Sequence, residues 1–269
     1  MTGTGALFDG LAAALRAERP VALATVVAGP GIGGALLVEP GAEGNGTDGR
    51  GTLGDPDLDR VVGRDAEAEL QAGTSGVRHY GPRGEARRDD VSVFIESFAP
   101  PPRMLIFGAV DFTAALVRLA KVLGYRVTVC DAREVFATKA RFPFADEVVV
   151  DWPNRLLERI GPELGPRDAV CVLTHDHKFD VPAVVAAMKT KVGYLGAMGS
   201  RRTHAERVDR LRREGVADED LVRLMAPIGL DIGARTPEET AVAVCAEIIA
   251  LRTGRPAPSL RGGEGPIHR

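Results

Sequence analysis

The sequence predicts an α/β protein in which a Rossmann-like domain with a parallel sheet follows a smaller α+β domain. After about residue 103, short apolar runs rich in β-branched residues alternate with helical stretches, the pattern of a parallel sheet with helical crossovers. The preceding residues are instead rich in glycine, and their strand-like runs are irregularly spaced. Between the two parts lies APPPR at residues 99–103, and consecutive prolines favour a stiff, extended linker.

The predicted small domain spans residues 1–98. VALATVV, GGALLVE and VSVFIESF have the composition of strands, and DPDLDRVVGRDAEAELQAG has the pattern of a helix. The intervening segment PGAEGNGTDGRGTLGD contains too few apolar residues to pack, so it is predicted to be an exposed, mobile loop.

The predicted Rossmann-like domain spans residues 104–256 and is followed by a flexible tail at 257–269. Its strands are RMLIFGA, RVTVCDA, EVVVD, DAVCVLT and VGYLGAM. In the first crossover helix, apolar residues at i, i+3, i+4 and i+7 form the buried face, and these are Leu116, Leu119, Ala120 and Leu123. Near the end, Thr236-Pro237-Glu238-Glu239 is a capping box that starts a helix running to about Leu251.

Composition limits the classes of partner. The chain has 269 residues, with 45% hydrophobic and 26% charged residues, a net charge of -3 and a pI near 6.0. Such a charge provides no general field for nucleic acid, so anions must bind at local clusters of Arg or Lys. No apolar run is long enough to span a bilayer and no signal peptide is evident, so we expect a cytoplasmic protein without membrane contact. The three cysteines lie in apolar runs and are predicted to be buried reduced thiols, namely Cys130, Cys171 and Cys245.

The first turn of the Rossmann-like domain, in LIFGAVDFTAAL, has the position of a dinucleotide-binding turn but only one of its three glycines. Gly108 can form the tight turn, and Asp131 at the end of the next strand could bind a ribose. Val110, however, would project into the space of a pyrophosphate, and Asp111 adds negative charge there. Two readings remain open: an NAD(P) site, which is disfavoured, or a turn that has lost phosphate binding and in which Asp111 is the helix N-cap.

The loop after the fourth strand, THDHKFD, is predicted to lie beside this turn. The strand order of such a sheet reverses between the first and fourth strands, and ligands bind outside the carboxyl ends there. His175 and His177 could bind a metal, with Asp131 or Asp231 completing the site. Alternatively the loop contacts a ligand or moves protons, with His175 as the candidate catalytic residue. A third reading is structural, with one histidine capping the loop. The candidate ligand-binding residues of this loop are Thr174, His175, Asp176 and His177.

The strongest predicted anion site follows the fifth strand, in GAMGSRRTHAER. Gly199 and Ser200 precede a helix whose first turn carries Arg201 and Arg202. Free amides at a helix N-terminus together with two guanidinium groups favour a phosphate. In the alternative reading the arginines pair with acidic residues of the chain. Further on, GLDIG places Gly229 and Asp231 in a segment predicted to form a wall of the same crevice.

These motifs resemble the Rossmann domain of the XdhC/CoxI family. The resemblance covers roughly residues 100–254 and rests on PPPRMLIFGA, VTVCDAR, RFPFADEVVVD, VLTHDHKFD, YLGAMGSRRTHAERVDRLRREG and APIGLDIGARTPEETAVAVCAEIIALRTG. Members are accessory proteins for molybdenum hydroxylases such as xanthine dehydrogenase and carbon monoxide dehydrogenase. The resemblance implies binding of molybdenum cofactor (molybdopterin), help with its sulfuration, and delivery to the apo-hydroxylase.

The sequence departs from the family pattern in three places. GAVDFT stands where the family has GAGHVG, and Asp55 and Pro56 replace glycines in the GTIGGG-type turn. The family's Cys-Gly-Gly element before the last strand of the small domain is absent, and Arg87-Arg88-Asp89-Asp90 stands there instead.

We therefore interpret the chain as a maturation factor, more a cofactor-binding chaperone than a stand-alone enzyme. We expect Gly199, Ser200, Arg201 and Arg202 to hold the cofactor phosphate. We expect His175 and His177 to contact its pterin or metal end, and Asp231 to orient polar groups of the ligand. The cofactor is expected in a crevice between the domains. Expected partners are the apo-hydroxylase, a cysteine desulfurase and a second copy of the chain in a homodimer. The alternatives are an NAD(P)-binding oxidoreductase and a non-catalytic adaptor with an empty Rossmann-like domain.

Overall fold

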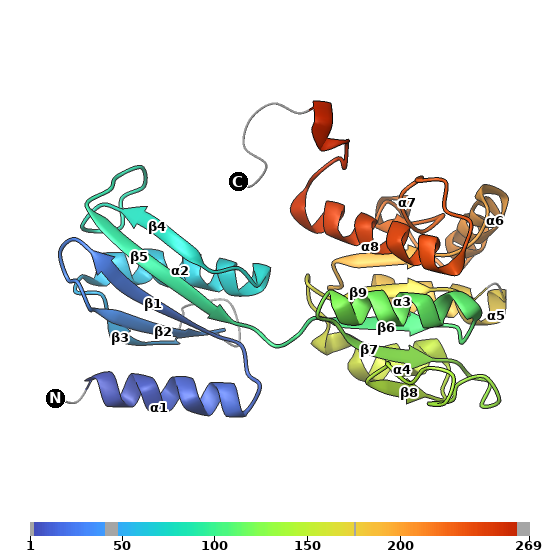
Figure 1. Cartoon of the computed structure of the whole chain (residues 1–269), viewed down its shortest axis with the longest axis horizontal. Coiled ribbons are helices and arrows are strands. Elements are labelled where there is room, and N and C mark those ends of the chain that lie inside the picture. Colours follow the sequence, from blue (N-terminus) through green and yellow to red (C-terminus); the bar gives the residue numbers. More distant parts are fainter. Residues whose placement is uncertain (1–2, 41–47, 175, 263–269) are drawn as a thin grey trace. The chain divides into compact units, whose positions relative to one another are not determined.

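The computed structural model describes residues 3–40, 48–174 and 176–262. The chain divides into two compact units, Met1–Pro100 and Pro101–Arg269, each considered by itself below (Figure 1). The first contains an antiparallel sheet and the second a parallel sheet, so the protein belongs to the mixed α/β class that the sequence predicts.

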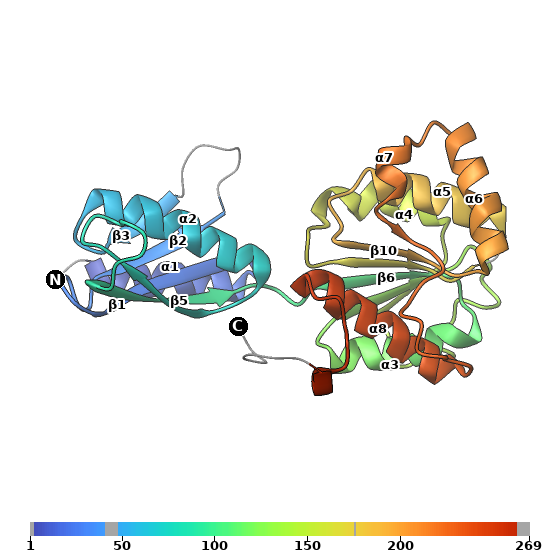
Figure 2. The same cartoon turned by 90° about the horizontal axis from the view of Figure 1, so that it is seen from above.

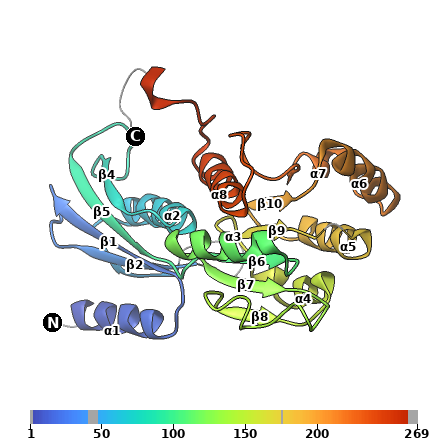
Figure 3. The ribbon, with the colours of Figure 1, turned by 45° about the vertical axis from the view of Figure 1, so that its right-hand side comes forward.

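The first unit is a five-stranded antiparallel sheet with a helix on each face (Figure 3). The strand order is β3-β2-β1-β5-β4. Alternate residues of β1 face opposite ways, so that Ala22 and Ala24 pack with α2, whereas Val21 packs with α1. The elements are α1 (Gly3–Arg16), β1 (Val21–Ala28), β2 (Ala35–Glu39), β3 (Asp48–Thr52), α2 (Pro56–Ala72), β4 (Gly76–Tyr80) and β5 (Val91–Phe98).

Part of the predicted mobile loop is a strand. Residues 48–52 form β3, which pairs with β2 in the register Leu37↔Arg50, so the prediction of a loop is wrong there; residues 41–47 lie outside the described part of the chain. Gly51 has a φ of +99°, and a Cβ on it would lie 2.3 Å from the carbonyl oxygen of Ala35. The glycine therefore permits close strand pairing, which composition alone does not distinguish from a loop.

The residues that replace the family's glycines start α2. Asp55 is the N-cap, and its carboxylate accepts hydrogen bonds from the amides of Asp57 and Leu58 at 2.9 and 3.2 Å. Pro56 occupies the first helical turn, where a missing amide hydrogen costs no hydrogen bond. This substitution is thus consistent with a well-capped helix.

The second unit contains a six-stranded parallel sheet in the order β11-β10-β9-β6-β7-β8. β6 pairs with both β7 and β9, so the order reverses between β6 and β9 as predicted. The strands are β6 (Arg103–Phe107), β7 (Arg126–Cys130), β8 (Glu147–Val149), β9 (Ala169–Val172), β10 (Tyr194–Ala197) and β11 (Leu224–Met225).

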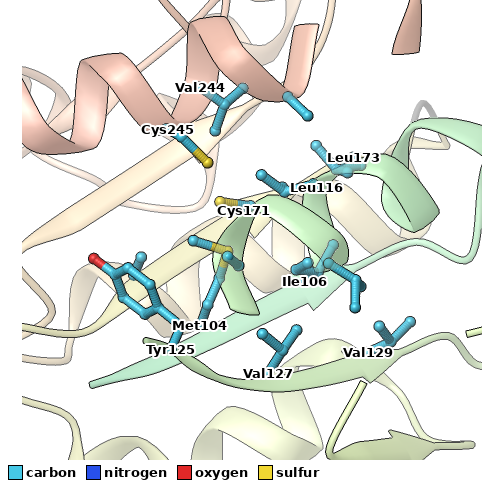
Figure 4. Packing of buried hydrophobic residues seen from close by; sticks show 14 of the residues in the cluster. Met104, Ile106, Leu116, Tyr125, Val127, Val129, Cys171, Leu173, Val244 and Cys245 are labelled. Carbon is cyan, nitrogen blue, oxygen red and sulfur yellow. The ribbon is translucent and has the colours of Figure 1, made fainter. Parts of the chain in front are cut away.

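Helices cover both faces of this sheet (Figure 2). α3 (Asp111–Val122) and α8 (Pro237–Thr253) lie on one face, while α4 (Pro153–Ile160), α5 (His177–Met188), α6 (Arg201–Arg213) and α7 (Asp218–Leu221) lie on the other. Short 3-10 turns are present at Gly161–Glu163 and Leu260–Gly262. Met104 and Ile106 of β6 face α3 and α8 (Figure 4). Leu105 and Phe107 of the same strand pack with α4 and α5 on the other face.

Two local predictions are confirmed in this unit. Thr236 is the N-cap of α8 in a complete capping box with Glu239. All three cysteines are buried and free, and Figure 4 shows Cys171 and Cys245 inside the core between the sheet and α8. Within the described residues, no helix has the length and apolarity needed to cross a membrane.

Candidate ligand site at the carboxyl edge of the parallel sheet

The β6–α3 turn lies against the β9–α5 turn. Gly108 has a φ of +111°, and a Cβ on it would lie 2.9 Å from the backbone nitrogen of Thr174. No L side chain fits this conformation and this contact without a backbone shift. The structure therefore brings two of the predicted site residues, Gly108 and Thr174, together at the point where the strand order reverses.

Asp131 is fully engaged within the protein. Its Oδ2 accepts a hydrogen bond from the Ala109 amide at 2.8 Å, and the Arg133 side chain bonds both oxygens at 2.9 and 2.8 Å. The Arg133 amide adds a bond to Oδ1 at 2.9 Å. Burial alone would raise the pKa of the Asp131 carboxyl, but these hydrogen bonds together outweigh burial and lower the pKa. A ribose or a metal at Asp131 would have to displace these donors.

Of the two open readings of this turn, the one that makes Asp111 the N-cap of α3 is wrong on that residue. The N-cap is Val110, which makes no side-chain capping bond, and Asp111 is the first helical residue. Its side chain is 92% exposed and lies 3.6 Å from the guanidinium of Arg141. The turn is held instead by Thr113, whose hydroxyl donates to the Gly108 carbonyl at 2.5 Å, and by Arg141, which donates to the Ala109 carbonyl at 3.0 Å. Asp111 thus lies in the first turn of α3 and faces solvent instead of capping the helix.

The β9–α5 turn provides a capped helix and an exposed histidine. Asp176 is the N-cap of α5 and accepts from the Lys178 amide at 3.2 Å, while its own amide donates to the Thr174 hydroxyl at 3.2 Å. His177 is the first residue of α5 and is exposed. His175, the candidate catalytic residue, lies outside the described residues.

A pocket of about 460 Å³ opens at this edge of the sheet. It is lined by Val110, Arg133, Thr174, Asp176 and His177. Three predicted site residues thus share one pocket with two residues that the sequence did not assign to ligand binding. Leaving His175 aside, the described residues contain no group of three or more His, Cys, Asp or Glu side chains that could hold a metal ion.

The β10–α6 turn retains free donors. Gly199 has a φ of +146°, and Ser200 caps α6 by accepting from the Thr203 amide at 3.1 Å. Arg202 is 90% exposed and pairs with Glu206 at 3.1 Å, whereas Arg201 is exposed and has no ion pair within the described residues. The alternative reading, that the arginines pair within the chain, therefore holds for Arg202 and not for Arg201.

A buried ion pair supports this turn from below. Nη2 of Arg207 lies 3.1 Å from Oδ2 of Asp180 and donates to the Met198 carbonyl at 2.7 Å, and both side chains are at most 2% exposed. Nη1 of Arg207, Oδ1 of Asp180 and Nδ1 of His204 are buried without a hydrogen-bond partner within the described residues. Burial, followed by the charge of Arg207, lowers the pKa of His204. Buried polar atoms are normally hydrogen-bonded, so these three are exceptions within the described structure.

Gly229 and Asp231 have different surroundings. The Gly229 amide donates to Oε2 of Glu247 at 2.9 Å, and the Tyr194 hydroxyl donates to the same oxygen at 2.6 Å, which ties this segment to α8 and β10. Asp231 is exposed and has no hydrogen bond or ion pair among the described residues. Neither residue lines the pocket of about 460 Å³, nor do the residues of the β10–α6 turn.

The second unit matches a known protein family. Residues 104–248, more than half of the chain, match the family model described as the XdhC Rossmann domain. The chain belongs to the XdhC family. The resemblance stated from the sequence motifs is thereby confirmed.

Two curated relatives match about three fifths of the XdhC-family chain. A protein of Bacillus subtilis (strain 168), named as a probable xanthine dehydrogenase subunit, is 34% identical over 161 residues, which are 60% of this chain and 46% of that protein. "Molybdenum cofactor insertion chaperone PaoD" of Escherichia coli (strain K12) is 30% identical over 159 residues, 59% of this chain and 43% of that protein. The matched regions thus span less than half the length of either relative.

A solved structure shares the fold of the XdhC-family chain. A crystal structure described as a xanthine dehydrogenase from Bacillus halodurans superposes with a TM-score of 0.54 and 21% identity, covering 96% of this chain and 98% of the other. At this identity the likeness concerns the fold alone.

Several site residues of this XdhC-family chain were missed from the sequence. Arg133 and Arg141 form contacts at the β6–α3 turn, and Asp180 pairs with Arg207 beneath the β10–α6 turn. One signal was available: Asp180 interrupts an apolar helical run, and a carboxylate buried there requires a partner. The partner itself, 27 residues away, could not be identified without the tertiary structure.

Proposed function

We propose that the chain is an accessory factor of a molybdenum hydroxylase that binds molybdenum cofactor as cargo and assists its insertion into the apo-hydroxylase. Membership of the XdhC family supports this role, as do the names of the two relatives, one after xanthine dehydrogenase and one after molybdenum cofactor insertion. The fold supports it as well, because the candidate residues lie at the carboxyl edge of a parallel sheet, where ligands of such sheets bind.

The β10–α6 turn is the observation that carries the proposal. The amides of the first helical turn precede the first intrahelical hydrogen bonds. The guanidinium of Arg201, which has no ion pair among the described residues, adds a full positive charge beside them. Basic residues in a first turn oppose the helix dipole unless an anion is present. The phosphate of the cofactor fits this donor set, with Ser200 and Arg202 contributing further polar contacts.

The pocket of about 460 Å³ fits the remainder of the cofactor. Thr174 and His177 present polar atoms, and the Arg133 side chain remains 44% exposed although it bonds Asp131. Gly108 does not line this pocket, but it allows the β6–α3 turn to touch the β9–α5 turn at Thr174, which does. These residues would bind and orient the heterocycle, and Asp231 would contribute only if the ligand reaches the exposed loop that carries it.

Sulfuration, if it occurs on this chain, would depend on a partner. Burial raises the pKa of the Cys130 thiol to about 12 and that of Cys245 to about 11, and it raises the pKa of Cys171 as well. A buried thiol that stays protonated does not accept a sulfur atom as a nucleophile. The proposal therefore assigns sulfur transfer to a cysteine desulfurase. A hydroxylase of the xanthine or carbon monoxide dehydrogenase type, a homodimeric state and a cytoplasmic location belong to the same proposal.

Mass spectrometry of small molecules released from the purified native protein tests the proposal. We expect a molybdopterin, and we expect Arg201→Ala to weaken its retention about tenfold to a hundredfold, the value of one charge-assisted contact of about 1.5–3 kcal/mol. Arg252→Ala removes an exposed arginine from α8, on the other face of the sheet, and serves as the matched control. An empty protein that still binds its hydroxylase would favour the non-catalytic adaptor instead.

The NAD(P)-dependent oxidoreductase is the second candidate function, and it predicts a different ligand. We expect NAD and NADP to bind no more tightly than about 100 μM, roughly 5.5 kcal/mol. The Ala109 amide already donates to Asp131, and the Arg133 side chain bonds both oxygens of Asp131. Val110 lines the pocket. Isothermal titration calorimetry measures this directly, and micromolar binding of either dinucleotide would contradict the expectation.

A further inference from the structure

A second cavity lies on the helical face formed by α4, α5 and α6. This groove encloses about 920 Å³ and is separate from the residues of the β10–α6 turn. Its floor is apolar and consists of Leu157 of α4 and Val181, Pro182, Val185 and Ala186 of α5. Figure 2 shows these helices on the face of the sheet opposite α3 and α8.

The rim of the groove is positively charged. Lys189, Arg210 and Arg213 line it, and none of the three forms an ion pair within the described residues. Lys178 also lines it but pairs with Asp176 at 3.5 Å. The carboxylates on the rim are those of Glu158 and Glu214, so cations outnumber acids there by four to two. This balance contrasts with the net charge of -3 of the whole chain.

We infer that this groove docks an acidic amphipathic helix of a protein partner. An apolar trough between helices accepts the apolar face of a helix. Carboxylates flanking that face would meet Lys189, Arg210 and Arg213, the rim cations that have no ion pair in the described part of the chain. An apolar floor of this extent does not suit a nucleic acid backbone, whose contacts are polar and ionic. The positive charge of the rim favours a negatively charged partner, and the apolar floor favours a partner helix with one apolar face.

The groove reaches the candidate ligand site. His177 lines both the groove and the pocket that contains Val110 and Thr174. A helix docked in the groove would therefore lie next to the pocket, where a recipient of bound cargo could reach it. This consequence rests on the proposed function, whereas the docking itself does not.

A pair of synthetic helices tests the docking on the full chain. The probe is a capped peptide with leucines at i, i+3, i+4 and i+7 and glutamates flanking them; its analogue carries lysine in place of every glutamate. We expect saturable binding of the glutamate peptide by fluorescence anisotropy. Arg210→Glu combined with Arg213→Glu should weaken it at least tenfold and should tighten binding of the lysine peptide by a similar factor. Val185→Gln should weaken both peptides through the floor.

The control reverses the same number of charges elsewhere. Arg252→Glu with Arg255→Glu changes two exposed arginines at the end of α8, and we expect less than a twofold effect on either peptide. Arg210→Gln with Arg213→Gln gives a milder pair should the double reversal fail to fold. Absence of saturable binding up to about 1 mM, about 4 kcal/mol, overturns the inference, as does an equal loss in the control.

The outcomes also separate this inference from the proposed function. The groove variants should retain as much cofactor as the unchanged protein, because none of their substitutions lies in the β10–α6 turn or the smaller pocket. A protein that binds no cofactor could still bind the glutamate peptide, so failure of the proposed function would not contradict the docking inference. Peptide binding that ignores the charge of the rim would overturn the docking inference alone.

Discussion

The turns β6–α3 and β10–α6 belong to the same parallel sheet, and each leads from a strand end into a helix. In the first, the Ala109 amide donates to Asp131, and Arg141 holds the Ala109 carbonyl and pairs with Asp111. In the second, Ser200 caps the helix, and Arg201 has no ion pair within the described part of the chain. The first turn satisfies its own polar groups, while the second leaves a charge available.

Position in a Rossmann-like sheet therefore does not by itself make a turn suitable for an anion. A dinucleotide fold uses the amides of its first turn for the pyrophosphate, but here Val110 and Asp111 occupy that place and the turn is closed by side chains. An anion site needs unpaired donors as well as a helix N-terminus. Of these two turns, the later one combines both features.

The largest expected effect concerns the buried ion pair beneath the β10–α6 turn. Arg207→Met leaves the buried carboxylate of Asp180 without its partner and removes a hydrogen bond to the Met198 carbonyl. Breaking a buried pair in this way costs about 3–5 kcal/mol of unfolding free energy. Urea denaturation measures the loss. The double variant Asp180→Leu/Arg207→Met removes both charges and should recover most of it; equal losses in the two variants would show that the pair is not what stabilises the turn.

The next effect tests whether the β6–α3 turn depends on a glycine. Gly108→Ala forces a left-handed conformation on alanine, at about 1–2 kcal/mol, and also places a Cβ 2.9 Å from the Thr174 nitrogen. Gly124→Ala is the matched control, since Gly124 has a φ of +81° but nothing within 4 Å of its Cβ position. We expect the loss at Gly108 to exceed that at Gly124 in thermal or urea unfolding. Equal losses would mean that the β6–α3 and β9–α5 turns can move apart without a cost in unfolding free energy.

Much of this arrangement could be predicted from the sequence, and the reason is local. The alternation of strands and helices and the capping box at Thr236 are encoded in short segments. The reversal between β6 and β9 follows from the strand order of the fold class that this alternation indicates. β3 was missed because glycines that permit strand pairing have the composition of a loop. Asp131 was correctly placed at a strand end, but its partners are set by tertiary geometry: the guanidinium of Arg133 and the amide of Ala109.

The closed turn also predicts a pH dependence. The pKa of Asp131 is lowered in the folded protein, so its contribution to stability is fully present above the pKa of the unfolded carboxyl, about 3.9. That contribution is lost as the pH falls below this value and through the lower folded pKa. Asp131→Asn should cost about 1.5–3 kcal/mol at neutral pH, the value of hydrogen bonds to a charged group.

Thermal melts from about pH 7 to about pH 2 span the pKa range of carboxyl groups and check both parts of this expectation. The difference in melting temperature between the unchanged protein and Asp131→Asn should shrink on the acid side. Asp231→Asn removes one exposed carboxylate and controls for the change in net charge. A difference that stays constant across the range would mean that Asp131 stabilises the turn through shape and not through its charge.

The smallest effect is the change in stability on removing an arginine from the β10–α6 turn. Its sign decides whether the arginines bind an anion or stabilise the fold through pairs within the chain. A cation in the first turn of α6 opposes the helix dipole, so Arg201→Ala in the ligand-free protein should leave the unfolding free energy unchanged or raise it by a few tenths of a kcal/mol. Arg202→Ala also loses an exposed pair with Glu206, worth about 0.3–0.5 kcal/mol, which offsets the gain from the dipole. Calorimetric melts of both variants, with and without bound cofactor, resolve the sign. If Arg201→Ala lowers the melting temperature of the ligand-free protein and leaves cofactor retention unaltered, the guanidinium serves the fold, and the phosphate must bind elsewhere.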